Sequence, residues 1–146
     1  MKKTILAMAV ILTVGLTSAF ANNSGDINHN AIAAFHKDFH AAKNVQWHQG
    51  KTFVKATFDL NNKVMYAYYT YRGELKAVIH HLLSTELPAE LESSIKNDYS
   101  GYWITDLFEL TNDDQHLYYV TIENADGKEV LKSDGTQGWR FYKSIK

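Results

Sequence analysis

The stretch FVKATFDLNNKVMYAYYTYRG, from Phe53 to Gly73, decides the fold class. Its first part has an apolar side chain at every second position, as one face of a strand requires: Val54, Ala56, Phe58 and Leu60. Asn61 and Asn62 then predict a tight turn, and an aromatic segment runs back to a second turn at Arg72. The stretch therefore predicts an antiparallel hairpin.

Segments on both sides of this hairpin also have strand character. They are Val45–His48, Glu74–Leu83, Tyr102–Leu110, His116–Glu123, Lys128–Lys132 and Trp139–Ile145. Polar or glycine-containing turns such as Asp126-Gly127 separate them. The return strand Lys63–Tyr71 is apolar on both faces, so its register stays open.

Two helical patterns precede the two sets of strands. The first runs from His29 to about Lys43, with apolar residues at three- and four-residue spacing: Ala31, Phe35, Phe39 and Ala42. The second begins at Pro88, where a fixed φ and a missing N–H cost nothing. Its apolar residues recur at every fourth position up to Gly101, a plausible terminator: Leu87, Leu91, Ile95 and Tyr99.

The order of these elements predicts an α+β fold. We expect two helix-plus-antiparallel-strand repeats (α-β4-α-β4), at about 29–83 and about 85–146, that form one sheet with helices packed on one face. Both repeats belong to a single domain, 22–146. The alternative is a chance similarity between two amphipathic helices.

The first residues have the pattern of a secretory signal peptide, 1–21. Lys2 and Lys3 precede an uncharged apolar run, and small residues at Ala19 and Ala21 place the cleavage after Ala21. The run would rise about 20 Å as a helix, short of a hydrocarbon core of about 30 Å. We therefore expect a periplasmic or secreted protein that is not inserted in the membrane after cleavage.

Composition excludes several classes of site. The 146 residues include no cysteine, which rules out disulfides, cysteine–zinc sites and a cysteine nucleophile. The net charge is −1, and −3 once Lys2 and Lys3 are removed, which argues against nucleic acid as a partner. No serine lies in a Gly-x-Ser-x-Gly elbow and no acid–base pair is recognisable. We predict a non-enzymatic protein without a cofactor.

The histidines offer an alternative function. His29, His36 and His40 fall on one side of the first predicted helix. The spacing His36-x3-His40 can hold a metal ion from one helical face. These residues would make the chain a periplasmic small-ligand or metal-binding module, although a solvent-exposed polar flank explains the same pattern.

Aromatic residues make up 13% of the chain and lie mostly in predicted strands. Successive strand residues point to opposite faces, so several rings must lie on the face without helices. We place Phe53, Trp103 and Tyr118 there as candidate partner-binding residues, because tyrosine and tryptophan are typical of binding surfaces. Cross-strand pairs that only stabilise the sheet are the alternative. A further alternative function is an enzyme on a helix-and-curved-sheet fold, which would need a deep pocket with convergent polar groups.

The sequence resembles the PepSY-like family of small secreted bacterial proteins, which is related in fold to the β-lactamase inhibitor proteins. Three segments carry the resemblance: Phe35-x3-Phe39 with Asn44-Val45-Gln46-Trp47, the hairpin up to Gly73, and Leu87-Pro88-x2-Leu91-x3-Ile95-x3-Tyr99-x-Gly101-Tyr102. The resemblance implies helices on one face of an antiparallel sheet. It also implies a binding or inhibitory role toward another extracytoplasmic protein or a peptide, without assigning any functional residue.

Overall fold

The computed structural model describes residues 27–113 and 115–145. The predicted signal peptide and its cleavage after Ala21 lie outside these residues. The elements in chain order are α1 (His29–Asp38), β1 (Lys43–Gln49), β2 (Val54–Leu60), β3 (Lys63–Tyr69), β4 (Leu75–His81), the short 3-10 helix η1 (Ser84–Glu86), α2 (Ala89–Asp98), β5 (Trp103–Thr111), β6 (His116–Asn124), β7 (Gly127–Ser133) and β8 (Arg140–Ile145).

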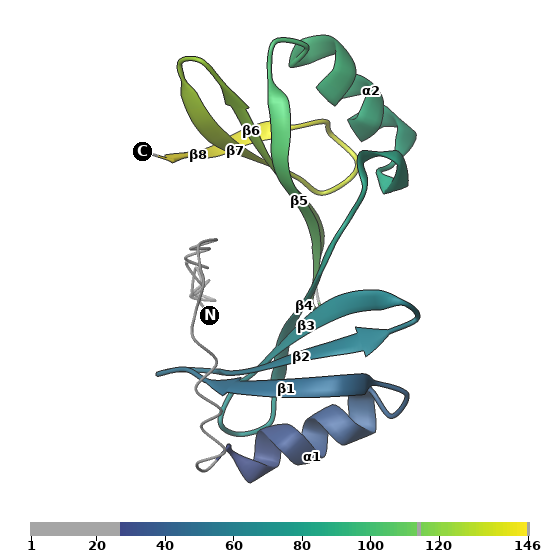
Figure 1. The fold of residues 1–146 in the computed structure, drawn as a ribbon, viewed down its shortest axis with the longest axis vertical. Coiled ribbons are helices and arrows are strands. Elements are labelled where there is room, and N and C mark those ends of the chain that lie inside the picture. The colour runs from purple at the N-terminus through teal and green to yellow at the C-terminus, as the bar shows by residue number, and fades with distance from the viewer. Residues whose placement is uncertain (1–26, 114, 146) are drawn as a thin grey trace, which may run out of the picture.

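The strands form one antiparallel sheet of eight, in the order β1 to β8 along the chain. Figure 1 shows a curved sheet with α1 on the outer side of the half that contains β1, and with α2 beside β5 in the other half. The predicted hairpin between β2 and β3 is confirmed, since Leu60 pairs with Lys63 across the turn. Asn61 and Asn62 have positive φ there, a conformation that asparagine tolerates.

The predicted fold class, two helix-plus-antiparallel-strand repeats (α-β4-α-β4) forming a sheet with helices packed on one face, is wrong. The structure is one continuous eight-stranded sheet with two helices of only ten residues. Such a helix is about 15 Å long, whereas eight strands spread over about 34 Å, so two of them cannot form a layer over this sheet. The ladder continues from β4 to β5, where His81 pairs with Phe108, so the strands do not divide into two repeats.

Helix α1 is shorter than the sequence pattern predicts. The Asn28 side chain caps its start by accepting hydrogen bonds from the backbone N–H groups of Asn30 and Ala31. The helix ends at Asp38, because Phe39 leaves the helical conformation with φ at −129°. The chain then turns back into β1 at Lys43, so the apolar residues beyond Asp38 pack from a turn and a strand.

Each helix covers its own apolar cluster on one face of the sheet. Under α1, the rings of Phe35 and Phe58 meet edge to face with centroids 4.9 Å apart. Under α2, Leu91 packs against Val120 and Leu131. The indole Nε1 of Trp139 also donates a hydrogen bond of 3.0 Å to the Leu91 carbonyl. Both clusters lie on the same side of the sheet, but each helix covers only its own cluster, so the two helices do not form a layer.

A third apolar cluster lies on the opposite side, which we call the open face. Its buried members are Ile79, Phe108, Leu110 and Leu117. The register between β2 and β3 places Ala67 opposite Ala56, which packs under α1. Tyr66 and Tyr68 therefore point to the open face, and both pack against the third cluster.

Candidate binding face of the sheet

A row of aromatic rings crosses the open face from β3 to β8. Its members, which we call the aromatic row, are Tyr66, His81, Phe108, Tyr119 and Tyr142. Ring centroids lie 5.9 Å apart from Tyr66 to His81 and 6.3 Å apart from His81 to Phe108. Phe108 and Tyr119 stack at 5.1 Å, and Tyr119 meets Tyr142 edge to face at 5.5 Å. The contacts are continuous, so the row is one surface rather than isolated rings.

Strand pairing positions the middle of the row. His81 on β4 lies opposite Phe108 on β5, and Phe108 lies opposite Tyr119 on β6. Directly opposed side chains in an antiparallel pair are near neighbours on the same face. The row therefore runs across the strands, and the backbone ladder fixes the spacing of its rings.

Charged groups lie along the same face. The Lys55 ammonium lies 5.8 Å from the ring centroid of Tyr66, and the Lys132 ammonium lies 5.7 Å from that of Tyr119. A cation over a ring face is attracted by the ring quadrupole, by about 0.5–1 kcal/mol at exposed sites. Between them, His81 Nδ1 lies 3.0 Å from a carboxylate oxygen of Asp106. The apolar rings thus alternate with polar groups.

The half-buried tyrosines of this face keep their hydroxyl protons. Burial, with a smaller contribution from Tyr142, raises the pKa of Tyr119 to about 12. Burial also raises the pKa of Tyr68, with Tyr66 adding to the effect. A neutral phenol both donates and accepts hydrogen bonds. These rings can therefore offer a partner both apolar area and a polar tip.

The sequence-predicted residues do not form one cluster. Phe53 lies beside the row, with its ring edge to face with Tyr68 at 5.5 Å. Trp103, the first residue of β5, is 54% exposed and pairs with Glu123. Tyr118 lies on the helix-covered side, where it packs against the cluster under α2. Phe53 therefore contacts the apolar cluster of the open face through Tyr68, but it has no ring contact with a member of the row.

Sequence reasoning missed most of the aromatic row because β6 is apolar on both faces. Leu117 and Tyr119 point to the open face, whereas Tyr118 and Val120 point to the helices. Each set contains a large apolar residue, so neither is favoured by hydrophobicity alone. The one polar residue in the centre of the strand, Thr121, lies on the same side as Tyr119. Thr121 was therefore the residue from which the side of Tyr119 could have been predicted.

The histidines of the α1 region are separated by the end of the helix. His29 begins α1 and His36 lies in its last turn, but His40 lies beyond the final residue, Asp38. His36 and His40 are thus not neighbours on one helical face. Within 27–113 and 115–145, no group of three or more histidine, aspartate or glutamate side chains is arranged to hold a metal ion.

A second polar cluster lies on the helix-covered side of the sheet. The Glu109 carboxylate pairs with His80 Nε2 at 3.1 Å and with His116 Nε2. Burial of the His80 ring lowers its pKa, and the Glu109 carboxylate only partly opposes that effect. The same carboxylate raises the pKa of Tyr118 beyond the effect of burial. This cluster ties β4, β5 and β6 together at the centre of the sheet.

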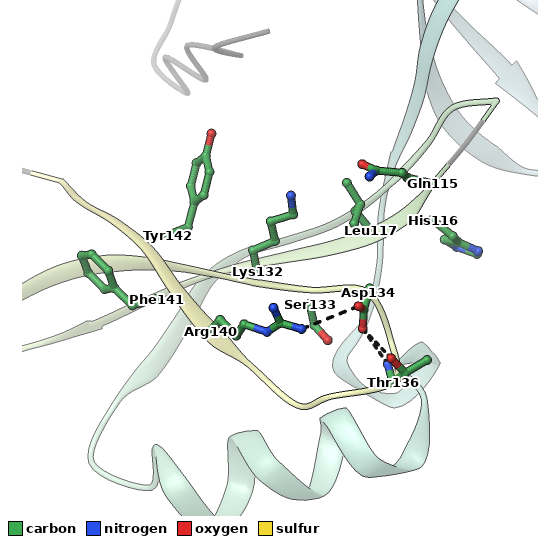
Figure 2. Close-up of a pocket in the computed structure, with 10 residues that line it drawn as sticks. All are labelled: Gln115, His116, Leu117, Lys132, Ser133, Asp134, Thr136, Arg140, Phe141 and Tyr142. Carbon is green, nitrogen blue, oxygen red and sulfur yellow. Dashed lines mark hydrogen bonds and ion pairs between the residues drawn. The ribbon is translucent and has the colours of Figure 1, made fainter. Parts of the chain in front are cut away.

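A pocket of about 530 Å³ lies at the β8 end of the row (Figure 2). Lys132 and Tyr142 stand on the same side of their strands in Figure 2. Among the described residues of the lining, the only carboxylate is Asp134, which accepts hydrogen bonds from Thr136 and lies 3.7 Å from Arg140. The described lining residues are Gln115, His116, Leu117, Lys132, Ser133, Asp134, Thr136, Arg140, Phe141 and Tyr142.

In the part of the chain that the structure describes, no helix has the length and apolarity to cross a membrane.

No protein-family model matches the sequence, and no curated protein matches it. Solved structures do match the fold. A BLIP-like protein from Bacteroides fragilis has a TM-score of 0.74 at 16% identity, over 84% of this chain and 89% of that chain. A DUF2874 family protein from Bacteroides ovatus has a TM-score of 0.72 at 17% identity, over 83% and 89%.

A third protein, from Bacteroides eggerthii and described as a candidate periplasmic protein, has a TM-score of 0.73 at 16% identity, over 83% of this chain and 91% of that chain. The expected likeness to the fold of the β-lactamase inhibitor proteins is therefore confirmed. At these identities the likeness concerns the fold alone, and the PepSY-like family resemblance remains a prediction.

Proposed function

We propose that this protein is an exported, non-enzymatic binding protein that holds another extracytoplasmic protein, or a peptide, on the open face of its sheet. The aromatic row is the observation that carries this proposal. It links rings from five strands through contacts of 5.1 to 6.3 Å. Rigid aromatic rings supply a large contact area at little cost in side-chain entropy.

The open face combines a firm centre with accessible ends. Phe108 is 2% exposed, so the centre of the row is fixed by packing. Tyr142 at the end of the row is 43% exposed and accessible to a partner. Binding surfaces commonly have such buried anchors with an accessible rim. We include Phe53 and Trp103 in the rim of this surface, and we leave out Tyr118 because it lies on the other side.

Export is part of the same proposal. The predicted signal peptide, 1–21, would deliver a single domain, 22–146, to the periplasm or the medium. The fold likeness to the B. eggerthii protein, which is described as a candidate periplasmic protein, supports that location. The likeness to the B. fragilis BLIP-like protein supports a binding role rather than catalysis.

Site-specific photocrosslinking in the cells that make the protein tests the proposal. A photoreactive phenylalanine at Tyr142 samples the open face, and the same group at Leu83, which is 70% exposed between β4 and η1, is the matched control. We expect a discrete crosslinked species from position 142 that disappears when Tyr119→Ala is added. The same species from position 83, or none from position 142, would contradict the proposal.

A further inference from the structure

The two lysines that lie over rings of the aromatic row have no acidic partner among the described residues. Neither Lys55 nor Lys132 forms an ion pair with a carboxylate in the described ranges, 27–113 and 115–145. Both side chains are half-buried, and each ammonium is directed over a tyrosine ring instead. They lie in opposite halves of the sheet, on β2 and β7. Positive charge is therefore uncompensated at two separate places on one face.

The carboxylates of the open face are already engaged. Asp106 pairs with His81, and Glu123 pairs with Lys128 at 2.7 Å. Asp59 accepts a hydrogen bond of 2.6 Å from the Asn44 side chain. None of these carboxylates forms an ion pair with Lys55 or Lys132. Both ammonium groups are therefore available to the carboxylates of a partner.

The pocket at the β8 end of the row has more cationic than anionic side chains among its described residues. Lys132 and Arg140 both line it, and Asp134, the one carboxylate among its described residues, already contacts Thr136 and Arg140. Apolar walls come from Leu117 and Tyr142. A side chain that fits this lining has an apolar stem and an anionic end. Charge complementarity of this kind selects partners and speeds their encounter.

We propose that the partner of the open face is an acidic polypeptide segment, whose carboxylates meet Lys55 and Lys132 while its apolar side chains lie on the aromatic row. This inference rests on the proposed binding function of that face. It defines the partner as an extended segment in which glutamate or aspartate alternates with apolar residues. One carboxylate enters the β8 pocket beside Lys132, and another reaches Lys55 at the opposite end of the row.

Three fluorescent twelve-residue peptides test this inference against the full mature protein. They alternate valine and tyrosine with glutamate, with glutamine or with lysine, so that only their charge differs. Fluorescence anisotropy measures binding at low and high sodium chloride. We expect the glutamate peptide to bind tightest and to lose affinity as salt screens the charges. Lys55→Glu and Lys132→Glu should each weaken it by about three- to tenfold.

Matched variants separate the possible failures. Lys37→Glu, on the exposed side of α1, makes the same charge change away from the open face and should leave the affinity unchanged. Equal binding of the three peptides, or no binding of the glutamate peptide, overturns the inference. Equal binding that is abolished by Tyr119→Ala overturns only the acidic partner and leaves the binding face intact.

Other occupants give different results in the same assay. Charge-dependent binding that Tyr119→Ala does not affect would keep the acidic partner but remove the aromatic row from the proposed function. Anionic phosphatidylglycerol vesicles are the remaining arm of the test. If Lys55→Glu and Lys132→Glu abolish binding to these vesicles while the glutamate peptide does not bind, the occupant is a lipid surface and the inference is overturned.

Discussion

Phe108 and Tyr119 stack face to face on the side of the sheet that no helix covers, with ring planes only 12° apart. Strand pairing places them directly opposite each other on β5 and β6. Phe108 is buried, although no helix lies over it, because neighbouring side chains on the same face surround it. This pair therefore serves both the stability of the sheet and the proposed binding face.

The first prediction concerns that pair. Phe108→Ala should reduce the free energy of unfolding by about 3–5 kcal/mol, because it removes a buried ring and leaves a cavity. Tyr119→Phe should cost much less, since the stacked ring stays in place. Urea denaturation followed by tryptophan fluorescence measures both. A loss below about 1 kcal/mol for Phe108→Ala would contradict the prediction, because it would mean that neighbouring side chains fill the space left by the ring.

The second prediction concerns the attachment of α1. The buried Tyr69 hydroxyl donates a hydrogen bond of 3.0 Å to an Asp38 carboxylate oxygen at the end of the helix. Tyr69→Phe removes the donor and should lower the free energy of unfolding by about 1–3 kcal/mol, since the bond is to a charged acceptor. Tyr71→Phe, which removes an exposed hydrogen bond from the hydroxyl to the neutral Gly50 carbonyl, is the comparison variant and should cost less. Equal losses in the two variants would show that the Tyr69–Asp38 bond does not hold the helix.

The third prediction concerns the turn before β4. Gly73 has φ at +83°, and a Cβ there would lie 2.7 Å from the backbone oxygen of Asn30 in α1. Gly73→Ala should therefore destabilise the protein by about 2 kcal/mol, from left-handed backbone strain and from this close approach. Gly101→Ala is the matched control, because a Cβ at Gly101 meets nothing within 4 Å. Similar melting temperatures for the two variants would contradict the prediction.

Local patterns were enough to predict the hairpin, because its register depends on a turn of two asparagines and on one clearly apolar face. They were not enough for the fold class: the local patterns predict two repeats, whereas the pairing of β4 with β5 joins residues far apart in the chain, such as Val78 and Thr111, in one ladder. No alternation within either strand encodes that contact. The length of α1 depends on the backbone conformation at Phe39, which the spacing of apolar residues does not predict.

The candidate site was predicted in kind but not in position. Surplus strand aromatics indicated that rings lie on a face without helices, and the aromatic row shows that they do. Tyr118 lies on the side opposite to the predicted one, because β6 has large apolar residues on both faces. A strand with two apolar faces gives no preference until its partners are known, since a shift of one residue exchanges the faces.

The fourth prediction concerns pH. Burial of the His80 ring, and to a lesser degree Lys63 and His116, lowers its pKa, while Glu109 and Glu86 act in the opposite direction without cancelling the shift. An unfolded chain has the ordinary histidine pKa of about 6.5 and so binds this proton more readily than the folded protein. Stability is therefore full above about pH 6.5 and falls as the pH drops through that value.

Urea midpoints at about pH 7.5 and about pH 5 measure this dependence, and the midpoint should be lower in acid. His80→Asn removes the titrating group and should reduce the difference between the two midpoints, whereas His29→Asn at the exposed start of α1 should not. If both variants keep the full acid loss, another group is responsible and the burial of His80 does not control stability. If His80→Asn alone flattens the profile, the cluster around Glu109 is the pH-sensitive element at the centre of the sheet.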